Sequence, residues 1–489
     1  MELTRLLDDV SAIQVVGEVQ RKDVADIVYD SRKVIKNSVF VAIKGYKSDG
    51  HKFILDALNK GALAVVTEVN DVIPDEIYNH TNAAKILVRD SRIALAELSD
   101  SFYRKPSSRL NLIGITGTNG KTTTSYFIKN ILEKAGNKTG LIGTISTIIG
   151  DTVIPSSLTT PESNDLNRLF YDMINEGCSA AVMEVSSHSL ELKRVHKLEF
   201  STAVFSNITS DHLDFHNTFE NYLTAKKILF DTLSVSSNCV YNIDDRNSKA
   251  IIADTRAKLF SYGCAENSDF KISDIKYDLK GTTFNLKYSG DVYTLHTGLV
   301  GEFNAYNATA AFASTIVSGI TPEQAVEGIK TTPQVPGRFQ VVSKNLKTVI
   351  IDYSHTEDSL RKALQAVRKI VGSDQPVYTV FGCGGNRDKS KRPLMGKVAS
   401  ELSDKIFITS DNPRDEEPLA IIDEIKKGIS KNNFRVIENR EEAIKSAIES
   451  SEDNAVILIA GKGHETYQEI KGKRSHFSDK EIAQKYLGI

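Results

Sequence analysis

The chain has 489 residues, of which 40% are hydrophobic and 25% charged, and its formal net charge is -2. This length exceeds what a single hydrophobic core serves and is typical of about three domains. The nearly balanced charge argues against nucleic acid or an anionic membrane surface as a partner. The N-terminus lacks a basic segment followed by a long apolar one, and no apolar run approaches the roughly 20 residues of a membrane span. We therefore expect a monomeric cytoplasmic protein that is neither exported nor anchored.

The cysteines indicate a reducing environment. They are far apart in the sequence and form no CxxC pair, which argues against both a disulfide framework and a zinc site. We expect free thiols at all four positions, Cys178, Cys239, Cys264 and Cys383.

The first 107 residues predict a small α/β domain. Short apolar runs indicate strands at 26–30, 38–43 and 62–67, and helical spacing indicates helices at 51–61 and 91–103. The polar, proline-containing segment RKPSSR then follows at 104–109. We place the first domain boundary within this segment, so that the domain covers residues 1–107.

A second domain is predicted from 108 to 332. Strands alternate with helical runs, which is typical of a mostly parallel sheet covered on both faces. A more polar stretch at 268–298 alternates with period two and predicts antiparallel strands, and a helix is expected at 304–319. The parallel strands are expected at 110–116, 180–186, 202–208 and 238–243.

The segment TTPQVPGRFQ at 331–340 reads as a linker into a third, Rossmann-like domain at 333–489. Strand and helix patterns alternate again there, which predicts a second doubly wound sheet. In such sheets ligands collect beyond the carboxyl ends of the strands, where most of the unusual polar clusters of this sequence fall. The strands are expected at 348–354, 377–383, 405–410, 434–438 and 455–461.

The stretch GITGTNGKTTT at 114–124 predicts a phosphate-binding loop. It departs from the strict P-loop pattern, because Ile115 stands where the first glycine is expected. Its context nevertheless fits, since a buried strand precedes it and apolar residues at helical spacing follow it. Backbone N–H groups, the mobile ammonium of Lys121 and the hydroxyl of Thr122 suit ATP with Mg²⁺. The alternative is a glycine-rich turn with an incidental lysine.

Two further strands end in residues that suit a magnesium site. Glu184 follows one strand and His212 the next, and we expect these to be adjacent strands that end at the same edge as the loop. Magnesium takes few protein ligands because water and phosphate oxygens complete its octahedron. Asp214 and His216 are interpreted instead as capping or surface groups.

Eleven motifs identify the chain, from about residue 30 to its end, as a member of the Mur ligase family. They resemble those of the family in order and approximate spacing. The resemblance implies three domains, which bind a UDP-sugar peptide, ATP and an amino acid respectively. The motifs are GTNGKTTT, TTPES, MEVSSHSLELKRV, FSNITSDHLDFH, YLTAKKILF, GEFNAYNATAA, GRF, DYSHTEDSL, GCGGNRDKSKRP, DNPRDEEP and GKGHETYQ.

The resemblance also implies the chemistry. ATP phosphorylates a substrate carboxylate, and an amine attacks the acyl phosphate to give an amide and free phosphate. Negative charge accumulates in both steps, so the site needs preorganised cations more than a strong base. The implied catalytic residues are Lys121, Glu184, His212 and Lys226.

The same resemblance assigns metal and nucleotide ligands. Metal ligands are Thr122, Glu184, His212 and Lys226, the last as a carbamate, because an ammonium cannot bind a metal. Repulsion from Lys227 is expected to favour the neutral amine that forms this carbamate. Residues from the third domain are expected to close on the nucleotide. The implied ATP-binding residues are Gly117, Thr118, Asn119, Gly120, Lys121, Thr122, Thr123, Asn304, Asn307, Arg338, Asp352 and His355.

The UDP-sugar peptide is expected to contact Ser31 of the first domain and four residues of the second. Without the resemblance, Ser31 could equally be a helix cap and Arg32 a surface charge. The second-domain residues are Thr159, Thr160, Ser186 and Arg194.

The third domain is expected to select the amino acid. Two guanidiniums and a carboxylate suit a zwitterion with an additional carboxylate, because arginine pairs bidentately with carboxylates. That chemistry and the DNPR motif favour meso-diaminopimelate, with L-lysine as the alternative. A folylpolyglutamate-synthase-like ligase and a non-enzymatic nucleotide switch are weaker alternatives. The implied amino-acid-binding residues are Arg387, Asp411, Asn412, Pro413, Arg414, Gly461 and Glu465.

Overall fold

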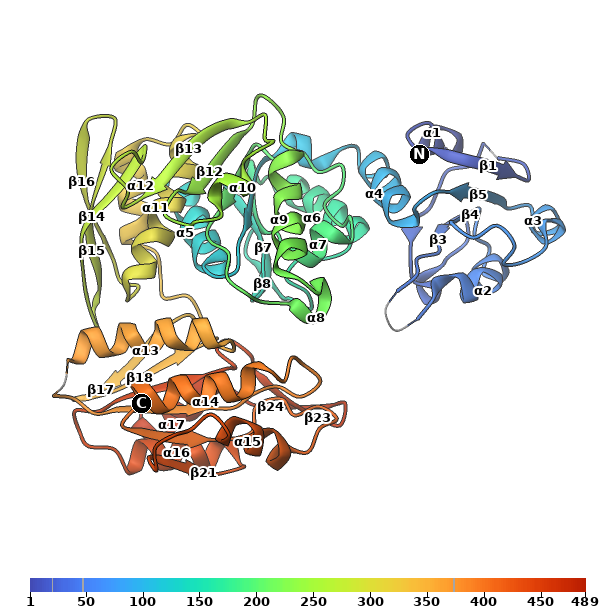
Figure 1. Ribbon diagram of the computed structural model, residues 1–489. Coiled ribbons are helices and arrows are strands. Elements are labelled where there is room, and N and C mark those ends of the chain that lie inside the picture. Colours follow the sequence, from blue (N-terminus) through green and yellow to red (C-terminus); the bar gives the residue numbers. More distant parts are fainter. Residues whose placement is uncertain (20, 46–47, 373) are drawn as a thin grey trace.

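A computed structural model describes residues 1–19, 21–45, 48–372 and 374–489. The strands of these residues form sheets of five, eleven and six strands and a two-stranded ribbon. Each large sheet is built from one continuous part of the chain, and Figure 1 shows the three parts side by side. The mixed α/β class and the largely parallel sheets expected from the sequence are confirmed.

The first sheet has the order β1-β5-β4-β3-β2. Strand β1 pairs antiparallel with β5, and the other described pairs are parallel. The sequence analysis missed α1, β1, α3 and β5. The strands are β1 (Ala12–Val16), β2 (Ile27–Val28), β3 (Val39–Val41), β4 (Ala64–Thr67) and β5 (Ala84–Val88). The helices are α1 (Leu3–Leu7), α2 (Ile54–Asn59), α3 (Asp75–Thr81) and α4 (Ser91–Phe102), with short 3₁₀ turns at Ser31–Lys33, Gly50–Phe53 and Pro106–Arg109.

The first sheet is attached to the central part through α4 and the central helix α6 (Ser163–Asn175). Ser99 Oγ donates to Asn164 Oδ1 at 3.1 Å, and Asn164 Nδ2 donates to the carbonyl of Ile27 at 2.7 Å. Tyr29 donates to Asp165 at 2.5 Å. Two of these hydrogen bonds are buried, so the polar groups at this junction satisfy one another across the two parts.

The central sheet has the order β16-β15-β14-β13-β12-β11-β6-β10-β7-β8-β9. Its middle is parallel, and antiparallel hairpins extend both ends. The predicted antiparallel strands of residues 268–298 are confirmed, and they continue the same sheet because β14 pairs parallel with β13. The strands are β6 (Asn111–Thr116), β7 (Thr139–Ile142), β8 (Ser146–Ile149), β9 (Thr152–Pro155), β10 (Ala180–Glu184), β11 (Thr202–Phe205), β12 (Asn238–Asn242), β13 (Lys258–Gly263), β14 (Phe270–Asp278), β15 (Gly281–Tyr288) and β16 (Asp291–Thr297).

Strand β6 lies between β10 and β11, so the expectation that β10 and β11 are neighbours was wrong. Strand order is a tertiary property, and chain order alone does not reveal it. The two strands flank the loop-bearing strand on either side, so their carboxyl ends still meet the loop.

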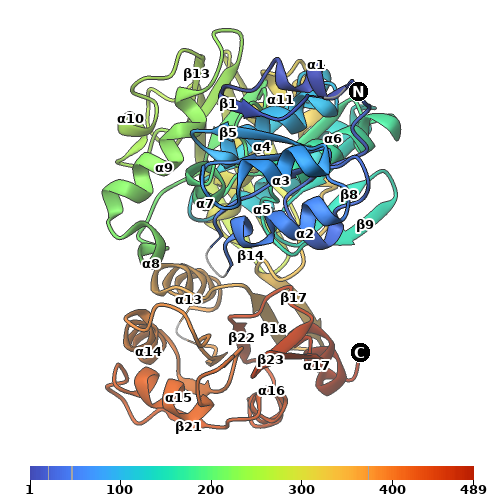
Figure 2. The same cartoon turned by 90° about the vertical axis from the view of Figure 1, so that its right-hand side faces the viewer.

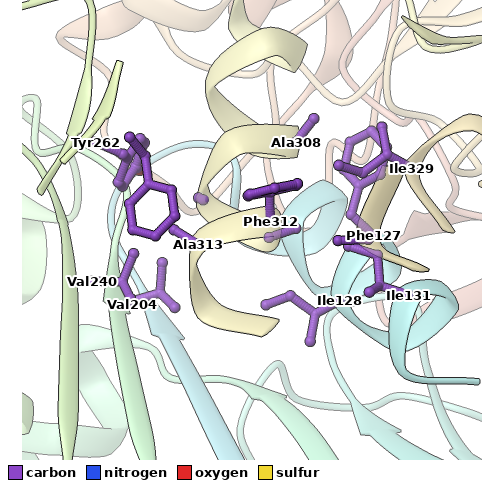
Figure 3. Packing of buried hydrophobic residues seen from close by; sticks show 14 of the residues in the cluster. Phe127, Ile128, Ile131, Val204, Val240, Tyr262, Ala308, Phe312, Ala313 and Ile329 are labelled. Atoms are coloured by element: carbon purple, nitrogen blue, oxygen red, sulfur yellow. The ribbon is translucent and has the colours of Figure 1, made fainter. Parts of the chain in front are cut away.

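Helices cover both faces of the central sheet. On one face α5 packs against the alanine-rich α11 and against α12. Figure 3 shows the core they form, with Phe127, Ile131 and Phe312 packed together and Val204 and Val240 contributed by the sheet. Helices α6, α7 and α9 pack on the opposite face. Besides α6, the helices are α5 (Lys121–Lys134), α7 (Ser187–Glu191), α8 (Leu213–His216), α9 (Phe219–Asp231), α10 (Ser248–Ile251), α11 (Glu302–Ile316) and α12 (Pro322–Lys330).

The third sheet has the order β17-β18-β22-β19-β20-β21, with β17 antiparallel to β18 and the other described pairs parallel. Helices α13 to α15 contribute to the core on one face, and α16 and α17 to the core on the other. The strands are β17 (Gln340–Lys344), β18 (Lys347–Asp352), β19 (Val377–Phe381), β20 (Lys405–Ile408), β21 (Phe434–Val436), β22 (Val456–Ala460), β23 (Tyr467–Ile470) and β24 (Lys473–His476). The helices are α13 (Glu357–Val371), α14 (Lys391–Leu402), α15 (Pro418–Lys426), α16 (Arg440–Glu449) and α17 (Asp479–Leu487).

The closest approach of α12 to α5 gives a stability prediction. A Cβ atom at Gly328 would lie 2.6 Å from the Cα of Ile131, so Gly328→Ala forces two helix backbones apart. Although alanine is the better helix former by about 1 kcal/mol, we expect overpacking of about 1–3 kcal/mol to dominate. The midpoint of thermal unfolding should fall. Gly298→Ala is the control, since no described atom lies within 4 Å of its added Cβ, and an unchanged midpoint for Gly328→Ala would contradict this packing.

Candidate functional site

A cavity of about 740 Å³ opens between the central and third parts. The loop after β6 and the ends of neighbouring strands line one side, and the segment before β17, the segment after β18 and helix α13 line the other. Helix α13 faces the central part across this junction in both views (Figures 1 and 2). The loop that carries GTNGK therefore faces a chamber that two sheets build together.

The loop is held by the end of β11. The N–H of Thr118 donates to the carbonyl of Asn207 at 2.8 Å, and the N–H of Asn119 donates to the Asn207 side chain at 3.0 Å. Gly120 has a φ of 90°, which places it in the left-handed region, and α5 begins at the next residue. The strand, loop and helix expected around the loop are thus present, with the N-terminus of α5 directed at the cavity.

Lys121 folds back over the loop. Its Nζ donates to the carbonyls of Gly117 and Thr118 at 2.8 and 3.0 Å. Burial lowers the pKa of this ammonium. The side chain is thus held over the loop, close to where an anion would sit at the helix N-terminus.

Glu184 lies directly behind Thr122. The Thr122 hydroxyl donates to Glu184 Oε2 at 3.0 Å, and Thr144 donates to both carboxylate oxygens, from its N–H at 2.8 Å and its hydroxyl at 2.9 Å. From the third part of the chain, Arg338 donates to the Thr122 hydroxyl at 3.0 Å. Three segments distant in sequence therefore meet at one hydroxyl.

His212 lies at the rim of the cavity, with a left-handed φ of 54° and its ring 3.6 Å from Asp211. Burial lowers its pKa, so its neutral form, which can bind a metal, is favoured. Within the described ranges, three or more His, Cys, Asp or Glu side chains nowhere gather as a metal-binding group. Thr122 and Glu184 are in contact, whereas His212 pairs with Asp211. His216 was interpreted as a capping or surface group, and the surface reading was wrong: its side chain is buried and meets the Ser187 hydroxyl at 3.0 Å.

Lys226 projects from α9 toward the loop after β6. Its buried Nζ donates to the carbonyl of Gly117 at 2.9 Å and lies 4.5 Å from the centre of the Tyr222 ring. Burial, and then the charge of Lys121, lower its pKa well below the ordinary value. The expected role of Lys227 was wrong: it points elsewhere and pairs with Asp231 at 2.6 Å, because consecutive residues of a helix do not share a face.

Four of the five residues expected to bind the UDP-sugar peptide form one network. The Thr160 hydroxyl donates to the Glu184 carbonyl at 2.8 Å and accepts from the Ser186 N–H at 3.1 Å. Arg194 donates to the Thr160 carbonyl at 3.0 Å, and the hydroxyl of Thr159 lies 3.1 Å from that of Thr144. This network continues the loop site toward the first part of the chain.

The fifth residue, Ser31, lies in a 3₁₀ turn of the first part. The cap of this turn is Asp30, which accepts from the N–H of Arg32 at 3.0 Å, so the cap alternative was wrong for Ser31. Arg32 is a surface charge with its side chain 86% exposed, and it pairs with Asp30. Ser31 itself is buried.

Asn304 and Asn307 share a face of α11 and bond to each other at 3.0 Å. Asn307 lines the cavity and touches the loop, since a Cβ at Gly120 would lie 2.4 Å from its Oδ1. Asn304 lies behind it and donates to the Val300 carbonyl. Sequence analysis missed Tyr306, which also lines the cavity and donates to Asp244 at 2.9 Å.

The third part contributes the residues expected to close on the nucleotide. Arg338 stacks over Tyr353 at 4.6 Å, Asp352 accepts from the N–H of Phe339 at 2.7 Å, and both line the cavity with His355. The sequence analysis missed Asp358 in the first turn of α13. Its carboxylate accepts from the side chains of Asn119 and Thr209 at 3.1 and 3.2 Å.

The residues expected to bind the amino acid lie at the ends of β19, β20 and β22, three neighbouring strands. Arg414 donates to the Gly385 carbonyl at 2.7 Å, and Pro413 packs against that glycine. A Cβ at Gly384 would approach both Arg414 and Arg387, so the two guanidinium-bearing residues flank one glycine. Their loops thus meet at the strand ends, as expected.

The other polar residues expected to bind the amino acid, Asp411, Asn412 and Glu465, form a second group. A Cβ at Gly461 would lie 2.6 Å from Asp411 Oδ2, and Asn412 donates to Glu465 at 2.8 Å. All three polar side chains contact Lys462, which the sequence analysis passed over although it stands inside the GKGHE motif.

Comparison with known proteins places the chain in a family. Residues 23–103 match a model described as "Mur ligase family, catalytic domain", residues 115–315 the "Mur ligase middle domain", and residues 337–463 the "Mur ligase, glutamate ligase domain". The chain belongs to the Mur ligase family. It is accordingly an enzyme, an ATP-dependent ligase that forms an amide bond and releases ADP.

Relatives cover the whole chain. A protein of Clostridium acetobutylicum named UDP-N-acetylmuramoyl-L-alanyl-D-glutamate--2,6-diaminopimelate ligase 1 is 43% identical, over 100% of this chain and 99% of its own. The ligase of that name from Bacillus licheniformis is also 43% identical, with the same coverage. A solved structure of such a ligase is 31% identical, with a TM-score of 0.71, and covers 100% and 99% of the two chains.

The fold is shared more widely. A folylpolyglutamate synthase of Mycobacterium tuberculosis, complexed with ADP and AMPPCP, has a TM-score of 0.64 at 18% identity, covering 76% of this chain and 92% of its own. In the part of the chain that the structure describes, every helix is too short or too polar to span a bilayer.

The geometry of the loop gives a binding prediction. Gly117 has a φ of 149°, and an added Cβ would lie 2.0 Å from the Ser206 hydroxyl. Gly117→Ala must therefore displace the loop, and we expect the affinity for ADP, measured by isothermal titration, to fall at least roughly tenfold. Gly298→Ala serves as the control. Wild-type ADP affinity in a folded Gly117→Ala protein would contradict the placement of phosphate at this loop.

Proposed function

We propose that this enzyme joins meso-diaminopimelate to UDP-N-acetylmuramoyl-L-alanyl-D-glutamate at the expense of ATP, in the synthesis of peptidoglycan precursors. The observation that carries the proposal is the full-length identity of about 43% with ligases named for this reaction. The paired arginines at the end of the third sheet support the choice of amino acid. A reaction on nucleotide-linked precursors places the enzyme in the cytoplasm.

The three parts of the chain take separate roles in this proposal. Residues 1–107 bind the UDP-sugar end of the acceptor, residues 108–332 bind ATP, and residues 333–489 bind the amino acid. The hydrogen-bonded junction between α4 and α6 supports a continuous acceptor site from Ser31 to Arg194. The cavity between the second and third parts, lined by the loop and by Thr159 and Ser186, supports a reaction centre where ATP and the acceptor meet.

The nucleotide phosphates bind over the loop at residues 117–123, in this proposal. The loop N–H groups and the α5 N-terminus face the phosphates, and the ammonium of Lys121 neutralises them. Asn307 lies beside the loop, and Arg338 reaches Thr122 from the third part. Arg338 therefore places a guanidinium beside the proposed position of the terminal phosphate.

The residues around Thr122 fit a magnesium ion. A hydroxyl and a buried carboxylate in contact are hard oxygen donors, and so small a set suits an ion that keeps several waters and phosphate oxygens. Thr122, Glu184 and His212 would hold it. When bound, the ion neutralises the charge of the terminal phosphate.

The need for ATP follows from the low reactivity of the acceptor carboxylate toward an amine. It is a poor electrophile and its oxygen a poor leaving group, and phosphorylation corrects both faults. The acceptor carboxylate takes the terminal phosphoryl group, and the amine of the amino acid then displaces phosphate to form the amide. Lys121 and Arg338 hold positive charge where negative charge develops in both steps.

Lys226 is proposed to act as a carbamate. Its neutral amine adds to carbon dioxide, forming a nitrogen–carbon bond and releasing one proton, and the product is an anionic oxygen ligand for a second magnesium. Two features support this: the buried amine has a strongly lowered pKa, and it lies at the Gly117 carbonyl beside Lys121.

The amino-acid preference is testable with Arg414. Purified enzyme should release phosphate with the UDP-muramoyl dipeptide and diaminopimelate, and much less with L-lysine, which lacks the far carboxylate. Arg414→Ala removes a charge-assisted pair of about 1.5–3 kcal/mol, so kcat/KM for diaminopimelate should fall roughly 10- to 150-fold. Arg435→Ala, an exposed arginine on β21, is the control. Phosphate release indifferent to both acceptor and amino acid would refute the proposed function.

The carbamate has its own test. Lys226→Ala should abolish activity, and millimolar formate or acetate should restore part of it by supplying the missing anionic oxygen. Lys227→Ala is the matched control, because that side chain points to Asp231 and should keep most activity. Full activity of Lys226→Ala without any added acid would contradict the proposed carbamate.

A further inference from the structure

Lys462 is fully buried beneath the proposed amino-acid site. Its Nζ donates to Asn412 Oδ1 at 2.9 Å and lies 3.2 Å from Glu465 Oε2 and 3.4 Å from Asp411 Oδ1. The side chain of Lys462 is 0% exposed, whereas that of Glu465 is 15% exposed. The lysine therefore lies behind the carboxylate, which is the member of the group that a ligand can reach.

The two hydrogen bonds that Glu465 accepts go to the same carboxylate oxygen. Asn412 and Lys462 both donate to Oε2, so the carboxylate is fixed through one oxygen while the other remains for a ligand. A buried pair elsewhere in this part behaves differently. Asp479 receives Arg440 through both oxygens at 2.8 Å, and both side chains are 0% exposed, as a purely structural ion pair would be.

We propose that Lys462 is a positioning and specificity-determining residue. Lys462 fixes the side chains of Asn412 and Glu465. Its positive charge also allows the carboxylates of Asp411 and Glu465 to share a buried site. The carboxylate of Glu465 then binds an ammonium group of the incoming amino acid. This inference rests on the proposed function. It adds a residue that the mechanism above does not use.

The charges around Glu465 support this role. Burial raises its pKa, the ammonium of Lys462 lowers it, and the carboxylate of Asp411 raises it. Tyr353 and Tyr467 also face this carboxylate, and Arg440 is close enough to feel its charge. Without Lys462 the pKa of Glu465 would rise further, so the carboxylate would lose its charge at a higher pH.

The lysine also sets the charge of the whole site. Arg387, Arg414 and Lys462 are cationic and Asp411 and Glu465 anionic, which leaves one net positive charge. Diaminopimelate with two ammonium and two carboxylate groups is neutral, whereas L-lysine carries a net positive charge. Lys462 therefore disfavours the cationic L-lysine by repulsion. This effect adds to the pairing of the far carboxylate of diaminopimelate with arginine.

The test compares Lys462→Met with Lys462→Arg. For Lys462→Met we expect KM for diaminopimelate to rise at least tenfold, the preference for diaminopimelate over L-lysine to fall, and KM for ATP to stay within twofold. The acid limb of kcat/KM for the amino acid should move to higher pH, because Glu465 protonates more readily. Lys462→Arg keeps the charge and should restore the position of that limb. Lys480→Met, exposed on α17, is the control.

A second variant keeps the inference testable if Lys462→Met does not fold. Asn412→Asp is isosteric and adds a negative charge at the lysine, so it should shift the acid limb in the same direction and weaken the preference for diaminopimelate. A folded Lys462→Met or Asn412→Asp protein with the wild-type pH profile and KM for diaminopimelate would overturn the inference. Wild-type enzyme without amino-acid-dependent phosphate release would instead refute the proposed function.

Discussion

Two lysines, the half-buried Lys121 and the buried Lys226, donate to one carbonyl oxygen, that of Gly117, and this arrangement shapes the centre of the molecule. Lys121 reaches it at 2.8 Å from α5 and Lys226 at 2.9 Å from α9. Burial lowers the pKa of both amines, and the charge of Lys121 lowers that of Lys226 further. Two cations this close in a dry site are unfavourable unless anions join them or one loses its charge. The site is thus prepared for phosphate oxygens before any ligand arrives.

The strand order of the central sheet brings the other site residues close to the Gly117 carbonyl. Strand β6 lies between β10 and β11, so the loop after β6 is flanked by Glu184 on one side and by residues 206–212 on the other. The Thr160 network then runs from the Glu184 backbone toward Arg194. A phosphate, its metal and an acceptor carboxylate can therefore share one sheet edge without any large insertion in the fold.

Much of this architecture could be predicted from the sequence, because strong signals mark the buried strands and amphipathic helices. The strand at Asn111–Thr116 and the helix after Gly120 follow from apolar runs and periodicity. Short, exposed strands such as β9 were missed, since their residues carry no burial pattern. For the site, motifs identified the loops but not their contacts. Lys227 was misjudged because sequence adjacency is not spatial adjacency, and Lys462 was overlooked because a lysine between glycines resembles a surface residue.

Gly337 packs directly on the GKGHE segment, since an added Cβ there would lie 2.1 Å from the N–H nitrogen of His464. The next residue, Arg338, reaches Thr122 at the nucleotide loop. Arg338, which is proposed to lie beside the nucleotide, and the segment carrying Gly461 and Glu465 are thus joined by direct backbone packing. In the proposed function, an ordering of Arg338 by the nucleotide would be felt by the segment that carries Glu465, and linkage makes such an effect reciprocal. The packing at Gly337 therefore gives a direct physical route between the two proposed substrate sites.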